Sequence, residues 1–267
     1  LLFFVGCQTD LTSDSNVGVG AQNSLTISIA PTRTHLGDKV GTTYPVYWSE
    51  GDKIAANDME SAAAEIKAED PAKAQFSFAS SLTYPCKVTY PYCSTATAEN
   101  PVVVFPAEQN YVEGSFACAP MCAYIKGSNE PIVMKHLTGV LRFPVKASKS
   151  GVILKKVVVT ATSGAKIAGE FAVDCDKASL TANGGSNVVT YSLPANFTLS
   201  TSEDSVFYIA LPAVEAGYCR VEFFDGNGDK MTSYWNGEVL KAGIVREFKS
   251  IVYRAGTTAS LSPFEVE

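Results

Sequence analysis

Apolar and polar residues alternate in short segments along most of the chain. Within residues 25–29 the apolar positions Leu25, Ile27 and Ile29 are separated by Thr and Ser, a two-residue period that is typical of a half-buried β-strand. Comparable segments, bounded by Gly, Pro, Asn or Ser, occur at residues 75–78, 86–90, 102–105, 121–125, 132–145, 152–160, 165–173, 188–193, 206–211, 218–224, 230–235 and 244–253. Many short strands with few helix signals predict an all-β protein built from β-sandwiches.

Two other segments carry local signals. Residues 47–54 predict a short strand, a Glu-Gly-Asp turn at residues 50–52 and the onset of a second strand. The Ala-rich residues 59–68 favour a short helix, because Asp58 can cap its N-terminus. A long irregular excursion is the alternative, since Pro71 closes the segment early and both neighbours are strands.

The domain organisation is inferred from length and from one polar segment. A chain of 267 residues is long enough for one or two domains. Residues 146–151 are small and polar, without apolar periodicity, and form the best candidate boundary. We predict an N-terminal β-sandwich over residues 24–147, a C-terminal β-sandwich over residues 148–256, and a tail over residues 257–267.

The N-terminal residues predict export. Residues 1–6 are apolar, end in Gly and precede Cys7, with no initiator Met before them. The run is too short to cross a bilayer and is typical of the end of a secretory signal whose start is missing. It resembles a bacterial lipobox, which makes Cys7 the candidate lipidation site; a hydrophobic strand or a cloning remnant is the alternative. The polar residues 8–23 predict a flexible tether.

Charge and composition exclude some partners. The net charge is -6, and acidic and basic residues are interspersed without a dense basic cluster, so nucleic acid is not an expected partner. After Cys7 no stretch is long and apolar enough for a membrane helix.

The cysteines leave their pairing open. Seven cysteines become six when Cys7 is set aside for lipid. Cys86 with Cys93, and Cys118 with Cys122, are close enough in sequence to pair, but spacing does not determine connectivity. Buried free thiols on strands are the alternative. No Cys-x-x-Cys pair is present, which argues against a zinc ribbon or a thioredoxin-like motif.

No motif in the sequence indicates catalysis. His35 and His136 have no companion in a nucleophile or metal motif, and a hydrolase would need a converging acid pair or triad that the sequence does not reveal. Residues 225–229, Asp-Gly-Asn-Gly-Asp, imitate the start of a calcium loop, but Asn236 stands where the bidentate Glu is required. A hairpin turn is the preferred interpretation there. We predict no enzymatic activity and no cofactor or metal.

Aromatic side chains support an alternative function. A surface glycan-binding lipoprotein would hold sugar rings on exposed aromatics, although aromatics in strands more often belong to a core. The candidates are Trp48, Tyr90, Tyr92, Tyr234 and Trp235.

Several segments taken together resemble the fimbrillin-like (type V pilin) lipoproteins of Bacteroidetes. They extend in order over most of residues 25–253, and comprise Cys7 after its apolar run, Thr32-Arg33-Thr34 after the first strand, and residues 46–54, 73–76, 90–91, 105–111, 119–121, 136–141 and 154–157. The resemblance implies two transthyretin-like β-sandwich domains in tandem. It also implies a lipoprotein exposed on the cell outer membrane, with a role as a fimbrial subunit or in adhesion.

The resemblance also implies a mechanism of assembly. In polymerising members of the family a protease cuts after an Arg, which releases an N-terminal strand and opens a groove for a strand of another subunit. Arg33 is then the candidate processing site, and Leu25, Ile27 and Ile29 are the apolar side chains of the exchangeable strand. The implied partners are other fimbrial subunits or further copies of this chain, together with host or bacterial surface ligands. Residues 264–266 alternate as a short donor strand would.

The alternative is a permanent first strand with Arg33 in an ordinary loop, because anchor, tip and non-polymerising relatives need not be cut. Cys7 would then hold the protein at the outer membrane as a base or a solitary adhesin. If Arg33 is cut, the lipid and the first strand leave together and the subunit can enter a fimbria.

Overall fold

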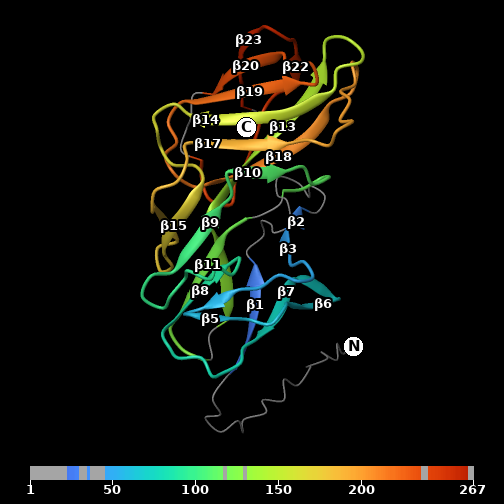
Figure 1. The fold of residues 1–267 in the computed structure, drawn as a ribbon. Coiled ribbons are helices and arrows are strands. Elements are labelled where there is room, and N and C mark those ends of the chain that lie inside the picture. Colours follow the sequence, from blue (N-terminus) through green and yellow to red (C-terminus); the bar gives the residue numbers. More distant parts are fainter. Residues whose placement is uncertain are drawn as a thin grey trace, which may run out of the picture.

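The computed structural model describes residues 23–29, 35–36, 46–116, 119–128, 131–235 and 240–263. All regular secondary structure in these ranges is β-strand (Figure 1), so the all-β prediction is confirmed. The strands are β1 (Ser24–Ile29), β2 (His35–Leu36), β3 (Val46–Tyr47), β4 (Ala55–Ala56), β5 (Met59–Glu60), β6 (Glu65–Lys67), β7 (Asp70–Ser77), β8 (Cys86–Tyr90), β9 (Val102–Phe105), β10 (Glu108–Asn110), β11 (Met121–Ile125), β12 (Ile132–His136), β13 (Thr138–Ala147), β14 (Leu154–Ala161), β15 (Gly169–Asp174), β16 (Ser179–Ala182), β17 (Val188–Ser192), β18 (Ser205–Pro212), β19 (Cys219–Asp225), β20 (Lys230–Trp235), β21 (Val245–Glu247), β22 (Ile251–Tyr253) and β23 (Thr258–Ser260).

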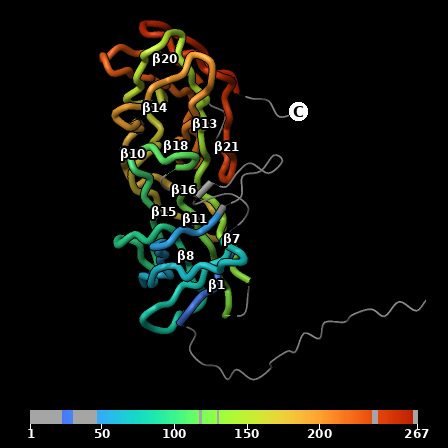
Figure 2. The backbone as a smooth tube through the Cα atoms, turned by 90° about the vertical axis from the view of Figure 1, so that its right-hand side faces the viewer, coloured from blue at the N-terminus to red at the C-terminus, as the bar shows by residue number. Residues whose placement is uncertain are grey.

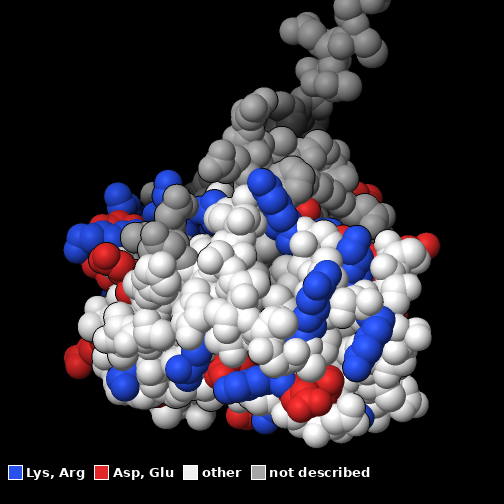
Figure 3. All heavy atoms as spheres, turned by 90° about the horizontal axis from the view of Figure 1, so that it is seen from above, with Lys and Arg blue, Asp and Glu red and all other residues white. Residues whose placement is uncertain are grey.

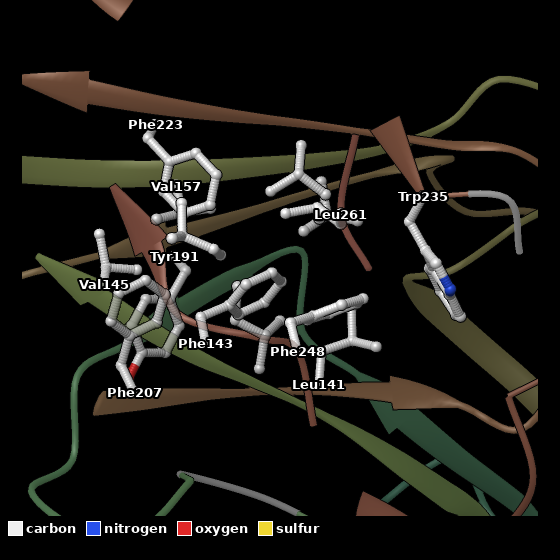
Figure 4. Packing of buried hydrophobic residues seen from close by; sticks show 14 of the residues in the cluster. Leu141, Phe143, Val145, Val157, Tyr191, Phe207, Phe223, Trp235, Phe248 and Leu261 are labelled. Atoms are coloured by element: carbon white, nitrogen blue, oxygen red, sulfur yellow. The ribbon is translucent and has the colours of Figure 1, made fainter. Parts of the chain in front are cut away.

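The C-terminal core is a β-sandwich. A six-stranded sheet in the order β10-β17-β14-β19-β20-β23 faces a smaller sheet, β18-β13-β21, whose central strand β13 also pairs with β22. Aromatic rings from both sheets meet between them (Figure 4). The ring of Phe143 lies 5.5 Å from that of Phe207 in its own sheet and 5.9 Å from that of Phe223 in the opposite sheet. All three side chains are fully buried, as expected for the inner faces of a sandwich.

The N-terminal core lies inside one curled sheet. Its eight strands follow the order β5-β4-β8-β11-β12-β1-β7-β6. An isolated bridge between Ser61 and Phe78 joins the segment after β5 to the segment after β7, so the two ends of the sheet approach each other. Trp48 is buried in this core, with its ring 4.9 Å from Phe76 of β7 and 5.4 Å from Tyr90 of β8. Apolar side chains from strands far apart in the sheet therefore share one core.

Two short strands cross between the halves of the chain. Strand β9 pairs with β15 in a three-stranded sheet, and β10 pairs in parallel with β17 at the edge of the six-stranded sheet. Figures 1 and 2 show these segments midway along an elongated molecule, between the N-terminal curled sheet and the C-terminal sandwich. The two cores are thus joined by backbone hydrogen bonds as well as by the covalent chain.

The domain boundary at residues 146–151 stays a prediction, and the strand before it already packs in the C-terminal core. β13 runs up to Ala147, yet it pairs with β18 from Thr138 to Val145 and contributes Phe143 to the C-terminal core. The chain therefore enters the C-terminal sandwich near Thr138, some residues before the polar segment. The polar residues 148–151 lie in the connection between the end of β13 and the start of β14. Whether the chain forms two transthyretin-like domains in tandem stays a prediction.

The helix predicted for residues 59–68 is wrong. That segment contributes β5 and β6, and β6 pairs with β7 in antiparallel register. Asn57 adopts a positive φ of 54° in the turn between β4 and β5, which reverses the chain into a hairpin. Ile66 packs against the N-terminal core. Sheet pairing and apolar burial thus override the helix propensity of the alanines.

The predicted tail at residues 257–267 is partly integrated into the fold. β23 pairs in parallel with β20, and Leu261 is buried in the C-terminal core. Residues 264–266, the candidate donor strand, lie outside the described residues.

Candidate strand-exchange site

Strand β1 lies inside its sheet rather than at an edge. It is parallel to β12 on one side and antiparallel to β7 on the other, so both of its edges take part in the ladder. Ile27 is opposite Ile132 in β12 and opposite Ala74 in β7. The pairing between these segments continues beyond the start of β1, where Phe78 N donates a hydrogen bond to Asn23 O at 2.8 Å.

The side chains of β1 confirm the predicted alternation. Leu25, Ile27 and Ile29 are buried, with exposed fractions of 1%, 0% and 6%. Thr26 is exposed and Ser28 is half-buried on the other face. All three apolar side chains belong to the N-terminal core. Burying each of them stabilises the fold by about 1.5–3 kcal/mol relative to exposure.

Removal of β1 would open a defined groove. β12 and β7 would each lose their partner, leaving unpaired backbone N–H and C=O groups, and the core would lose three apolar side chains. Unpaired strand edges readily accept another strand, because the incoming backbone restores the lost hydrogen bonds. The site is therefore chemically suited to exchange of one apolar strand for another.

A turn at residues 49–52 supports the wall of this groove. Asp52 Oδ2 accepts a hydrogen bond from Ser49 N at 2.8 Å, and Asp52 Oδ1 accepts one from Tyr90 Oη at 2.8 Å. Burial raises the pKa of the Asp52 carboxyl above its ordinary value of 3.8, while these two hydrogen bonds act in the opposite direction. Trp48 N donates to Pro71 O in β7 at 3.0 Å. The predicted strand-turn-strand pattern of residues 47–54 is confirmed, and it braces the strand next to β1.

Arg33 and Cys7 lie outside the described residues, and both stay predictions. Cys118, one of the cysteines considered for pairing, also lies outside them. His35 lies in β2, where it pairs with Tyr47 of β3.

The remaining candidate sites resolve into structural roles. Residues 225–229 form the turn of the β19–β20 hairpin, and Asp225 Oδ1 accepts hydrogen bonds from Asn227 N at 2.9 Å and Asp229 N at 3.0 Å. The hairpin interpretation is confirmed, because the side chain of Asp225 is occupied by its own turn. His136 is buried at the end of β12. Within the described ranges there is no group of three or more His, Cys, Asp or Glu side chains suited to holding a metal ion.

The aromatic candidates for glycan binding are mostly in the cores. Trp48, Tyr90 and Trp235 are buried, which contradicts a role for them as exposed platforms. Tyr92 is partly buried, and Tyr234 has 38% of its surface exposed. The described residues contain no helix that is long and apolar enough to span a membrane.

Sequence reasoning did not find the walls of the β1 groove. Ala74 and Ile132 flank Ile27, although they lie 47 and 105 residues later in the chain. Each wall strand is recognisable as a strand from its own alternation. No local signal tells that the two strands share β1 as a partner.

Comparison with solved structures places the fold. The chain resembles a "putative cell adhesion protein" from Bacteroides ovatus, with a TM-score of 0.53 and 12% identity over 92% of this chain and 97% of that chain. It equally resembles a protein of the same description from Bacteroides uniformis, with a TM-score of 0.53 and 14% identity over 90% of this chain and 94% of that one. No protein-family model matches the chain, and no curated protein matches it in sequence. The likeness shows a shared fold, and that fold agrees with the resemblance to fimbrillin-like proteins.

Proposed function

We propose that the protein is a fimbrial subunit or a surface adhesion lipoprotein that assembles by exchange of strand β1. The observation that carries the proposal is the position of β1. It is N-terminal, it is hydrogen-bonded on both edges, and its three apolar side chains fill the N-terminal core. A strand of this kind can be replaced only by another strand with the same alternation, which makes exchange specific.

The fold and the surface support this class of function. Two solved structures with the same fold, from Bacteroides ovatus and Bacteroides uniformis, are each described as a "putative cell adhesion protein". On the face viewed from above, Lys and Arg side chains are interspersed with Asp and Glu and leave wide uncharged areas (Figure 3). A mixed surface of this kind suits contacts with other proteins or cell surfaces better than binding of nucleic acid.

Lipidation at Cys7 and cleavage after Arg33 complete the proposal. Before cleavage, Cys7 would hold the protein on the outer membrane through residues 8–23. Cleavage after Arg33 would remove the lipid and β1 together, and β12 and β7 would then bind a strand from another subunit. An uncut chain would act at the membrane as an anchor or a solitary adhesin.

The test uses an arginine-specific protease on the full chain. The expected result is a product that begins at Thr34, followed by oligomers seen by size-exclusion chromatography with light scattering. An Arg33→Lys variant should stay uncut at this position and monomeric. A synthetic peptide with the sequence of residues 23–30 should slow oligomer formation by refilling the groove. A chain that is cut after Arg33 but persists as a monomer argues against strand exchange.

Glycan binding stays the alternative function. Of the five aromatic residues considered, Tyr234 is the most accessible, with a neighbour in register at Arg220 of β19. Glycan-array binding that is lost in Tyr234→Ala and kept in a Trp48→Phe control would favour this alternative.

A further inference from the structure

Two cysteines that are far apart in the sequence meet in the middle of the molecule. Cys122 lies in β11, and Cys175 directly follows β15. Both are buried, with exposed fractions of 0% and 1%, and both belong to an apolar cluster that also contains Phe105 and Phe171. The Cys122 side chain is the neighbour that most strongly raises the pKa of the Cys175 thiol, as expected for two thiols that lie side by side. The sequence separation of 53 residues, 175 − 122, gave no hint of this contact.

Strand alternation makes this pair specific. In the β8–β11 ladder Cys122 is opposite Thr89, whereas Cys86 is opposite Ile125. Because neighbouring residues of a strand point to opposite faces, Cys122 and Cys86 project from opposite sides of the sheet. Cys86 indeed belongs to the N-terminal core, and Cys122 does not. The sheet itself separates Cys86 from the pair.

The segment that carries Cys175 is held against the same face. Cys175 Sγ lies 3.9 Å from Val88 O, the backbone of the strand next to β11. One residue later, Asp176 O accepts a hydrogen bond from Lys135 Nζ of β12 at 3.0 Å. These contacts keep the turn after β15 over β8, β11 and β12, which leaves Cys175 facing Cys122.

The other described cysteines have different surroundings. Cys93 lies in a loop, where its Sγ is 3.1 Å from Thr95 Oγ1. Cys219 is buried in the C-terminal core and contacts its own turn at Gly217 O. All five described cysteines (Cys86, Cys93, Cys122, Cys175 and Cys219) are free thiols in the structure, so the pairing of Cys86 with Cys93 suggested by their spacing is not seen there.

We propose that Cys122 and Cys175 form a disulfide when the chain folds in the presence of a disulfide oxidant. The two thiols together lose two electrons and two protons as the S–S bond forms, and the oxidant is reduced to two thiols. The bond would connect the curled sheet to the β15–β16 hairpin. Since β11 is next to β12, it would also stiffen one wall of the β1 groove.

The chemistry of the two thiols indicates when the disulfide should form. The Cys122 side chain, together with burial, raises the pKa of the Cys175 thiol. Thiol–disulfide exchange needs a thiolate and access for the oxidant, so the folded dithiol should oxidise slowly. The bond should instead form during folding, and once buried it should resist mild reductants.

The experiment refolds the full chain in a buffer of reduced and oxidised glutathione. Free thiols are then blocked with N-ethylmaleimide under denaturing conditions. Peptide mapping by mass spectrometry is expected to find Cys122 linked to Cys175, and reduction of the linked protein should lower its Tm by roughly 5 °C or more. This result needs no variant, so it does not depend on any mutant folding.

Variants give the matched controls. Cys175→Ala should lose the linked peptide and its Tm should no longer respond to reductant. Cys219→Ala removes an equally buried thiol, and this variant should retain both the linked peptide and the response of its Tm to reductant. Full alkylation of Cys122 and Cys175 in the refolded wild type, or a map that links Cys122 to Cys118, would overturn the proposal. Either outcome leaves strand exchange at β1 unaffected, because that is measured by cleavage and oligomer formation.

Discussion

The side-chain amide of Gln109 makes two hydrogen bonds with the backbone of Ala210. Its Nε2 donates to Ala210 O at 2.7 Å, and its Oε1 accepts from Ala210 N at 3.2 Å. The backbone of Gln109 meanwhile lies in β10, opposite Tyr191 of β17. Ala210 belongs to β18 in the other sheet of the sandwich. One residue from the first half of the chain therefore joins both sheets of the C-terminal core.

Replacing this amide should destabilise the C-terminal sandwich. Gln109→Leu has a similar size, but it leaves the buried N–H and C=O of Ala210 without their partner, which is expected to lower the free energy of unfolding by roughly 2–4 kcal/mol. Urea unfolding followed by fluorescence measures the change. Asn110→Leu, at the exposed next position of β10, should change it by less than about 0.5 kcal/mol. Equal effects of the two variants would show that the Gln109 hydrogen bonds contribute nothing.

The core-facing side chains of β1 should contribute more to the stability of the fold than the side chains on its other face. Ile27 is fully buried between Ile132 and Ala74, so Ile27→Ala is expected to lower the free energy of unfolding by about 2–5 kcal/mol. Thr26→Ala changes the exposed face of the same strand and should be close to neutral. Denaturant unfolding of the uncut chain provides the measurement. If β1 were only loosely attached, Ile27→Ala would be as mild as Thr26→Ala.

The Asp52 carboxyl should make stability depend on pH. Burial raises its folded-state pKa above the ordinary value of 3.8, so the folded state binds the proton more tightly than the unfolded state. The stabilising contribution of Asp52 is then fully present below 3.8 and is lost as pH rises through the folded-state pKa. The free energy of unfolding of the wild type, minus that of Asp52→Asn, should therefore fall as pH rises from the acid side.

A control tests the cause of this pH dependence. Tyr90→Phe removes the hydrogen bond that Tyr90 Oη donates to Asp52, and that hydrogen bond favours the carboxylate. In this background the fall should move to higher pH. If the free energy of unfolding of the wild type minus that of Asp52→Asn rises with pH instead, the folded state stabilises Asp52 as the carboxylate.

Local patterns predicted the strands well, and they failed where distant segments decide the outcome. The alternation of Leu25, Ile27 and Ile29 correctly predicted which face of β1 is buried, because a two-residue period depends only on neighbours in sequence. The Gly-rich residues 225–229 likewise predicted their hairpin. The Ala-rich residues 59–68 do not form a helix, because β7 provides a strand with which β6 pairs. No local pattern could indicate that partner strand.

The candidate site shows the same division. The apolar residues of the exchangeable strand were recognisable from their pattern and from the family resemblance. Their location in the middle of a sheet was not, because β7 and β12 are separate strands that meet only through β1. The crossing of β9 and β10 to the second half of the chain was equally hidden, since pairing over 60 or more residues leaves no local signature.

Leu240 packs so closely against Gly139 that a side chain at residue 139 should destabilise the fold. Gly139 lies in β13, and a Cβ built there would come within 3.0 Å of three side-chain atoms of the buried Leu240. Gly139→Ala is therefore expected to lower the free energy of unfolding by about 1–3 kcal/mol through overpacking. Gly127→Ala, where a Cβ meets nothing within 4 Å, serves as the control. Because the clash is with Leu240, the double variant Gly139→Ala with Leu240→Ala should lose less stability than the sum of the two single variants, and a thermodynamic cycle from urea unfolding measures the difference. Strict additivity would locate the cost of Gly139→Ala in the backbone of β13 instead of in this contact.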